Sequence, residues 1–237
     1  MKGISIIMPS FLGKYDNSRS NSESKFIRAV ESFLIQSLKE KELIIISHGC
    51  YMTNKIYEER YKSNDNIKLI KAFNEDYIKV GNLREAARSF AKYDWISYLD
   101  SDDIILKGHL FSISDAINKN QGLNFLINEQ YITPITDKPD IGLLTFFKGD
   151  LSKFNEYYKI TQSIEGIGKV LIMQTGLHVG TWQITHHNSV NIKWPYGFKG
   201  EDKRFIELLK KSYEYATYRG QYVIMHQVWS DGIVWDN

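Results

Sequence analysis

The sequence predicts an α/β fold in which a mostly parallel β-sheet is covered by helices on both faces. Short runs such as 4–9 (ISIIMP) are apolar almost throughout, as is typical of strands buried on both sides. Segments with apolar residues at helical spacing separate these runs, and strands that alternate with helices form parallel sheets. The 237 residues are 43% hydrophobic and 24% charged, which is ordinary for a globular domain.

The first part of the chain supplies most of the regular elements. Apolar runs are expected to form strands at 4–9, 42–47, 67–73 and 95–99. Amphipathic segments are expected to form helices at 26–34, 55–61 and 80–90. Ser20 or Ser22 is the candidate N-cap of the first helix, because a hydroxyl oxygen there can accept a hydrogen bond from the first helical turn.

The chain after residue 103 is less regular. Residues 201–213 (EDKRFIELLKKSY) have a clear amphipathic pattern and are expected to be helical, as is the shorter segment 152–158. Strands are expected at 177–184 and 221–228. The pattern of residues 121–150 does not place strands.

Composition limits the class of protein. Cys50 is the only cysteine, which excludes an internal disulfide and favours a reducing, cytoplasmic compartment. No apolar run reaches the roughly 18 residues of a membrane helix, and the first residues are typical of a strand rather than a signal peptide. The formal charge is +2 with both signs interspersed, which does not by itself indicate a polyanionic partner.

An acidic cluster follows the strand expected at 95–99, in the stretch WISYLDSDDI. Residues two apart on an extended backbone face the same way, so Asp100 and Asp102 can converge. Ligands of parallel sheets bind beyond the carboxyl ends of the strands, where this pair lies. Two carboxylates suit Mg²⁺ or Mn²⁺ together with substrate phosphates. Asp103 is expected to make a local bond to the backbone of the turn.

Four stretches in order resemble family 2 glycosyltransferases of the GT-A fold. They are the first strand with Pro9 and Ser10, ELIIISHGC (42–50), VGNLREAARSFAKYDWISYLDSDD (80–103) and GFKGED (197–202). The resemblance implies a single GT-A domain over residues 1–237. Its nucleotide-sugar-binding half would span 1–103 and its acceptor-binding half 104–237.

The resemblance also implies roles for residues at the donor site. Asp100 and Asp102 would hold a divalent cation, Mn²⁺ or Mg²⁺, against the diphosphate of a nucleotide-sugar. Arg84 matches the arginine of the family's A-R-N motif and would lie close to the nucleotide. Pro9 and Ser10 would belong to the backbone that cradles the nucleoside.

One turn departs from the family pattern. The second strand of the family usually ends in an acidic turn that helps to read the base, whereas this chain has Ser47, His48, Gly49 and Cys50 there. Ser47 or His48 could hydrogen-bond a base instead. A UDP-sugar is the expected donor, and the base itself is open.

The acceptor side is implied by the acidic pair Glu201 and Asp202 at the start of a helix. Asp202 would act as general base on the acceptor hydroxyl, with Glu201 as the alternative; otherwise the two acids only stabilise the helix N-terminus. His226 is either a third metal ligand or a core histidine. Three aromatic residues could stack on an acceptor sugar or pack in the core: Trp182, Trp194 and Tyr196.

The resemblance therefore implies an inverting, metal-dependent glycosyltransferase that acts on a hydroxyl acceptor, in glycan or surface polysaccharide synthesis. The acceptor would be a glycan or glycolipid, and the enzyme cytoplasmic or peripheral at the inner face of a membrane. One alternative is a soluble enzyme that glycosylates a nucleic-acid base, as in viral DNA modification. Its support would be a local basic face made by Lys199, Lys203, Arg204, Lys210 and Lys211. Another is a sugar- or nucleotide-binding module without catalysis.

Overall fold

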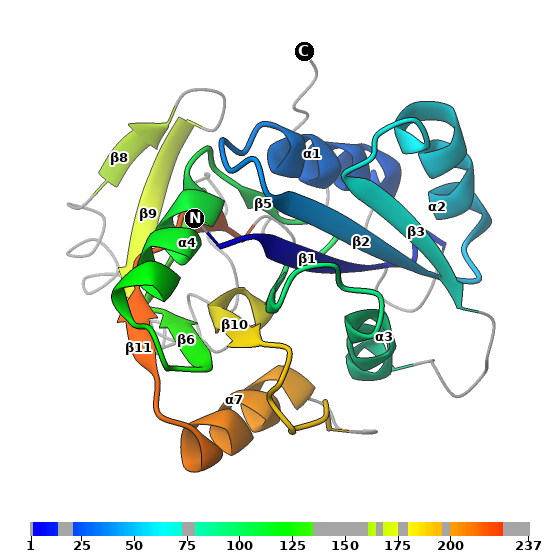
Figure 1. Cartoon of the computed structure of the whole chain (residues 1–237). Coiled ribbons are helices and arrows are strands. Elements are labelled where there is room, and N and C mark those ends of the chain that lie inside the picture. The colour runs from blue at the N-terminus through cyan, green and yellow to red at the C-terminus, as the bar shows by residue number, and fades with distance from the viewer. Residues whose placement is uncertain are drawn as a thin grey trace.

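The computed structural model describes residues 2–13, 21–72, 79–134, 161–164, 168–174, 180–195 and 200–224. Its largest element is a seven-stranded sheet, which occupies the centre of Figure 1. In spatial order the strands are β11 (Ala216–Tyr218), β6 (Phe125–Asn128), β10 (Ile184–His187), β4 (Trp95–Tyr98), β1 (Ile4–Ser10), β2 (Lys41–His48) and β3 (Ile67–Ala72). The neighbours from β4 to β3 are parallel, and only β10 runs antiparallel to both its neighbours. The predicted mostly parallel sheet is confirmed.

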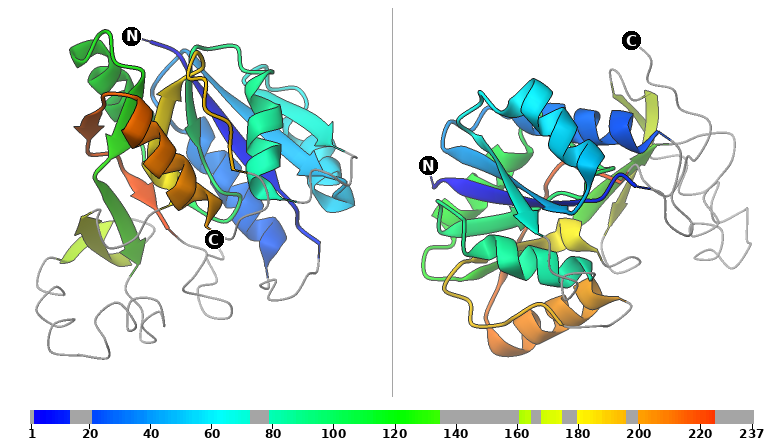
Figure 2. Two further views of the ribbon diagram at one scale, coloured as in Figure 1. Left: turned by 90° about the horizontal axis from the view of Figure 1, so that it is seen from below. Right: turned by 90° about the vertical axis from the view of Figure 1, so that its right-hand side faces the viewer.

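Helices cover both faces of this sheet (Figures 1 and 2). On one face lie α1 (Ser22–Leu34) and α4 (His109–Lys119), and on the other lie α3 (Val80–Arg88) and α7 (Glu201–Ser212). The helix α2 (Tyr51–Ile56) continues as the π-helical turn η1 (Tyr57–Tyr61) between β2 and β3.

The strand β1 shows why the run 4–9 is apolar on both sides. Ile4, Ile6 and Met8 pack into the core beneath α1, and Ile7 packs into the core beneath α3 and α7. Successive side chains of a strand point to opposite faces, so a strand between two cores needs apolar residues at nearly every position.

A smaller five-stranded sheet packs beside the first. Its order is β5 (Ile104–Ile105), β12 (Tyr222–Val223), β7 (Gln130–Pro134), β9 (Gly168–Gln174) and β8 (Thr161–Ile164). The strand β5 comes directly after the acidic cluster, and β12 pairs with it. The pairing of β5 with β12 therefore fixes the chain that directly follows the predicted metal site.

The sequence-based elements in the first part of the chain are confirmed, with shifts at their ends, and so is the helix at 201–213. The predicted N-cap is wrong for Ser22, which is already the first helical residue; Asn21 takes the cap position with a left-handed backbone (φ 60°). The Ser22 hydroxyl instead donates to the carbonyl of Leu12, at 3.2 Å. Ser20 lies outside the described residues.

Two expected strands are corrected in their described parts. Residues Thr181–Gln183 form a 3₁₀ turn (η3) because the Gln183 side chain accepts the Gly180 N–H at 3.2 Å, so the strand starts at Ile184. At the C-terminal end only Tyr222–Val223 pair as a strand. The remainder of 221–228 beyond residue 224, and the helix expected at 152–158, lie outside the described residues. Among the described helices none has both the length and the apolar character needed to cross a bilayer.

Candidate active site

A cavity of about 630 Å³ opens where β1, β2 and β4 end. It is lined by Pro9, Ser10, Phe11, His48, Val80, Leu83, Arg84, Asp100, Ser101 and Asp102. Most of the donor-site residues predicted from the sequence are therefore brought together in one place. The carboxyl ends of parallel strands meet at one edge of a sheet, which is where such cavities form.

Among the predicted site residues, Glu201 and Asp202 do not line this cavity, and neither Ser47 nor His226 is placed on it. Ser47 is fully buried, and its hydroxyl donates to the carbonyl of Cys50 at 3.4 Å, closing the turn after β2. His226 lies outside the described residues. His48, the neighbour of Ser47, is partly exposed and does line the cavity.

The acidic turn is held from behind by a tyrosine of the smaller sheet. The Tyr222 hydroxyl accepts the backbone N–H of Asp100 and donates to the Asp103 carboxylate, both at 3.1 Å. Burial, reinforced by the charges of Asp103 and Asp100, raises the pKa of Tyr222 well above its usual value. The hydroxyl therefore stays protonated and remains a donor. Asp103 is buried, so its main role is to anchor the turn.

Arg84 is a buried cation between two carboxylates (its side chain is 4% exposed). Its guanidinium lies 2.7 Å from Asp100 Oδ1 and 3.3 Å from Glu201 Oε1. Burial alone would lower the pKa of Arg84, but Asp100 and Glu201 together raise it above the usual value. Arg84 thus lines the cavity and also connects the acidic turn to the start of α7.

The other oxygen of Asp100 has a partner too. Thr181 Oγ1 donates to Asp100 Oδ2 at 2.9 Å. Both carboxylate oxygens of Asp100 therefore accept bonds from the protein, which fixes the orientation of the group at the cavity wall.

The acidic pair stands at the first turn of α7. Gly200, which precedes it, has a left-handed backbone (φ 84°) that a glycine adopts without strain. Asp202 Oδ1 accepts the backbone N–H of Lys203 at 2.7 Å. Burial raises the pKa of Asp202, and the charges of Glu201 and Asp100 add to this, although the Lys203 bond and Arg84 oppose it. A raised pKa makes Asp202 a better proton acceptor when it is ionised.

The aromatic residues near this end are packed in the core. Trp182 and Trp194 are 3% and 4% exposed. The Trp194 ring stacks on Phe205 at a centroid distance of 4.2 Å, and Trp182 contacts Tyr131 at 4.7 Å. Core packing therefore accounts for both tryptophans; Tyr196 lies outside the described residues.

Asp100 and Asp102 are the carboxylates on the cavity wall that could hold a divalent cation. Within the described ranges no cluster of three or more His, Cys, Asp or Glu side chains is arranged to hold a metal. Mg²⁺ and Mn²⁺ need less than that, because they bind through one or two carboxylates plus substrate phosphates. Both oxygens of Asp100 already accept protein hydrogen bonds, from Arg84 and Thr181.

Thr181, Tyr222 and Phe11 are among the residues of this site that sequence reasoning missed. Thr181 and Tyr222 are 81 and 122 positions away from Asp100, and no local pattern links them to it. Phe11 could have been found, because it directly follows Pro9 and Ser10 at the end of a predicted strand. Its ring is 43% exposed and lies 6.4 Å from that of His48.

The fold and the cavity define an α/β protein whose cavity opens at the carboxyl edge of a mostly parallel sheet, the edge at which such sheets bind their ligands. The profile of glycosyl transferase family 2 matches residues 5–162, more than half of the chain. The chain belongs to glycosyl transferase family 2. A comparison with curated proteins gives no match.

Solved structures of similar fold include Staphylococcus aureus TarS. The crystal structure of TarS 1–349 aligns with a TM-score of 0.60 at 15% identity, covering 95% of this chain and 59% of that chain. The same fragment in complex with UDP-GlcNAc aligns with a TM-score of 0.60 at 16% identity, covering 95% of this chain and 57% of that chain. A longer TarS structure aligns with a TM-score of 0.60 at 16% identity, covering 95% of this chain and 36% of that chain. The chain thus spans less than two thirds of these proteins, and the likeness establishes the GT-A fold.

The Tyr222 contact predicts a specific loss of stability. Tyr222→Phe leaves the buried Asp103 carboxylate and the Asp100 N–H without this partner, so the free energy of unfolding should fall by about 1–3 kcal/mol. Urea denaturation measures this. Tyr218→Phe is the matched control, because its buried hydroxyl meets the neutral hydroxyl of Thr185 at 3.1 Å. Equal losses in the two variants would contradict the anchoring role.

Proposed function

We propose that this protein transfers a sugar, with inversion, from a nucleotide-sugar to an acceptor hydroxyl and requires a divalent cation. One observation carries the proposal: a single buried arginine, Arg84, joins a carboxylate of the donor cavity to the acidic pair of α7. Donor and acceptor groups must meet at one point for a sugar to move directly between them. Membership of glycosyl transferase family 2 supports the reaction class.

The proposed donor is a UDP-sugar. TarS has been solved in complex with UDP-GlcNAc and shares the fold. A cavity of about 630 Å³ is large enough for a ligand of this size. Because Ser47 is buried under the turn and does not line the cavity, the partly exposed His48 is the better candidate for contact with the nucleoside.

The charges around the cavity favour the binding of a cation together with the diphosphate. Asp100 and Glu201 pair with Arg84, and Asp202 lies near them. Asp102 lines the same cavity, with Arg28 of α1 nearby. These four carboxylates outnumber the two arginines, so a diphosphate would meet a surplus of negative charge. Asp102, assisted by Asp100, would hold Mn²⁺ or Mg²⁺, and the bound ion would supply positive charge to the diphosphate.

In the proposed transfer step, Asp202 accepts the proton of the acceptor hydroxyl. The acceptor oxygen forms a bond to the anomeric carbon on the face opposite the diphosphate. The bond from that carbon to the diphosphate oxygen breaks, and its electron pair leaves with the nucleoside diphosphate. The acceptor proton passes to the Asp202 carboxylate as general base.

The acceptor and the location stay predictions. A glycan or glycolipid hydroxyl fits the reaction class. For the nucleic-acid alternative, the predicted basic residues of α7 are all exposed: Lys203, Arg204, Lys210 and Lys211. Arg204 pairs with Glu207 at 3.5 Å. Lys199, also part of the predicted basic face, lies outside the described residues. A cytoplasmic location follows only from the sequence.

Metal-dependent nucleotide binding should require Asp102. UDP with Mn²⁺ at about 100 times its dissociation constant would stabilise the fold by about 2.7 kcal/mol, which thermal denaturation detects. Asp102→Asn should remove this stabilisation, and EDTA should remove it from the wild-type protein. Asp115→Asn is the control, since Asp115 pairs with Lys119 on the exposed face of α4. An undiminished Mn²⁺-dependent shift in Asp102→Asn would reject the metal assignment.

Asp202→Asn should lower kcat by about 10²–10⁴-fold, the usual contribution of a general base, with donor affinity nearly unchanged. In the wild-type protein kcat should fall as the pH drops through the raised pKa of Asp202, because the base must be ionised. Turnover of UDP-GlcNAc with Mn²⁺ at several pH values measures both. Glu201→Gln should cost less; a larger loss there would make Glu201 the base.

A further inference from the structure

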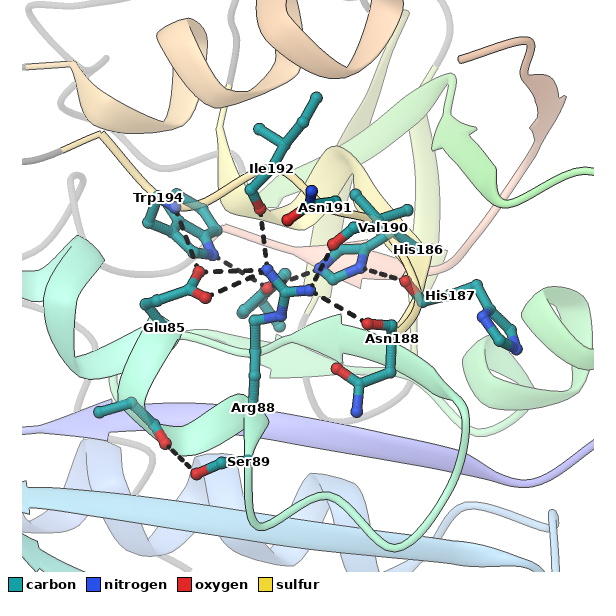
Figure 3. Close-up of polar contacts among 12 residues, drawn as sticks. Glu85, Arg88, Ser89, His186, His187, Asn188, Val190, Asn191, Ile192 and Trp194 are labelled. Carbon is teal, nitrogen blue, oxygen red and sulfur yellow. Dashed lines mark hydrogen bonds and ion pairs between the residues drawn. The ribbon is translucent and has the colours of Figure 1, made fainter. Parts of the chain in front are cut away.

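Helix α3 carries a second buried arginine, one turn after Arg84, that the proposed reaction does not use. The Arg88 guanidinium donates to three backbone carbonyls of the segment that follows β10 (Figure 3). These are the carbonyls of Ile192 at 2.9 Å, Val190 at 2.8 Å and Asn188 at 3.3 Å. These carbonyls belong to no helix or strand, so they have no N–H partner from regular secondary structure. The guanidinium of Arg88 supplies the N–H donors instead.

Glu85 completes this contact. Its carboxylate lies 3.1 Å from Arg88 Nη1 and accepts the backbone N–H of Trp194 at 3.2 Å. Figure 3 shows the two side chains of α3 facing the segment from Asn188 to Trp194. We name Glu85 and Arg88 the α3 clasp, because together they hold this segment along its length.

The clasp ends at Trp194, which lies between α3 and α7. The Arg84 guanidinium carbon lies 5.0 Å from the Trp194 ring centre, and the ring stacks on Phe205 of α7. The indole N–H donates to the Tyr98 hydroxyl at 3.0 Å. The tryptophan is therefore a spacer between the helix of Arg84 and the helix of the acidic pair.

The packing around Gly81 leaves this spacer little freedom. A Cβ atom at Gly81 would lie 3.3 Å from Glu201 Cγ and 3.5 Å from both Trp194 Cβ and the Pro195 carbonyl oxygen. The first turn of α3, the segment held by the clasp and the first turn of α7 thus converge at one point. Trp194 and Glu201 therefore both lie close to the backbone of Gly81.

We propose that Glu85 and Arg88 are positioning residues that, through Trp194, set the start of α7 against Arg84 and so place the acceptor base relative to the donor carboxylates. The inference rests on the proposed function. Arg88 does not line the cavity, so its effect on transfer is indirect. A planar guanidinium fork can serve three carbonyls and a carboxylate at once, which the compact ammonium of lysine does not reproduce.

The chain offers a matched control for a purely structural role. The Lys41 ammonium, also buried, donates to the carbonyls of Phe33, Leu34 and Gln36. Lys41 is the first residue of β2, at the end of that strand away from the cavity. Lys41→Gln therefore removes a comparable three-carbonyl contact without touching the candidate site.

The first readout needs no substrate. The indole N–H resonance of Trp194, identified by its loss in Trp194→Phe, reports the Tyr98 hydrogen bond by NMR. It should shift and exchange faster with solvent in Arg88→Gln and in Glu85→Ala, less in Arg88→Lys, and remain unchanged in Lys41→Gln. An unmoved resonance in folded Arg88→Gln or Glu85→Ala overturns the proposal.

The second readout separates transfer from donor binding. A misplacement of about 1 Å can cost about 10²-fold in rate, so Arg88→Gln should lower kcat for UDP-GlcNAc with Mn²⁺ by at least about tenfold. The affinity for UDP with Mn²⁺ should stay within about twofold, and Lys41→Gln should keep both constants even if its melting temperature falls as much. Equal kcat in the two variants overturns the proposal. If the wild-type protein turns over no nucleotide-sugar, the proposed function and the catalytic part of this inference fail together, whereas the indole resonance still decides whether the clasp holds Trp194.

Discussion

Arg84 is a buried cation held by carboxylates from distant parts of the chain, and the geometry of the candidate site depends on it. Asp100 is 16 positions and Glu201 is 117 positions away in sequence. A buried guanidinium is costly without partners, and each carboxylate needs a counter-charge when it leaves water. The three groups therefore stabilise one another in one arrangement. That arrangement places the acidic turn after β4 beside the first turn of α7.

Both faces of the large sheet, together with the smaller sheet, contribute to this site. The strands whose ends form the cavity pack into the core beneath α1 on one face and into the core beneath α3 and α7 on the other. The core beneath α3 and α7 positions Arg84 and the acidic pair, since Leu83 and Phe205 pack in it. The smaller sheet contributes Tyr222, which ties the acidic turn to β12. Sugar transfer would take place where these three units meet.

Much of the fold could be predicted because it is encoded locally. The strand β1 is apolar on both sides, and α7 has a regular amphipathic pattern, so both were found with nearly correct bounds. Asp100 and Asp102 were placed at the edge of the sheet by the rule that parallel strands end there, whereas His48 and Arg84 were placed at the same site by the family resemblance. All four line one cavity. The rule about strand ends needs only the order of strands and helices.

The rest depends on contacts that no local pattern encodes. The four-residue strands β6 and β10 are fixed by pairing with distant partners, and η3 by a side-chain bond of Gln183. Trp194 could be read from the sequence as a sugar-stacking or a core residue, and its neighbours Phe205 and Arg84 decide for the core. The role of Arg88 depends on the path of residues 188–194, which carries no periodic signal.

The link between Arg84 and Glu201 can be measured without any substrate. Urea unfolding of Arg84→Met, Glu201→Gln and the double variant gives the free energy of interaction between the two side chains. If the bridge exists, the effects should be non-additive, with an interaction of about 0.5–3 kcal/mol, as for residues in direct contact. Effects that add to within about 0.3 kcal/mol would show that Arg84 does not connect the two sides of the site.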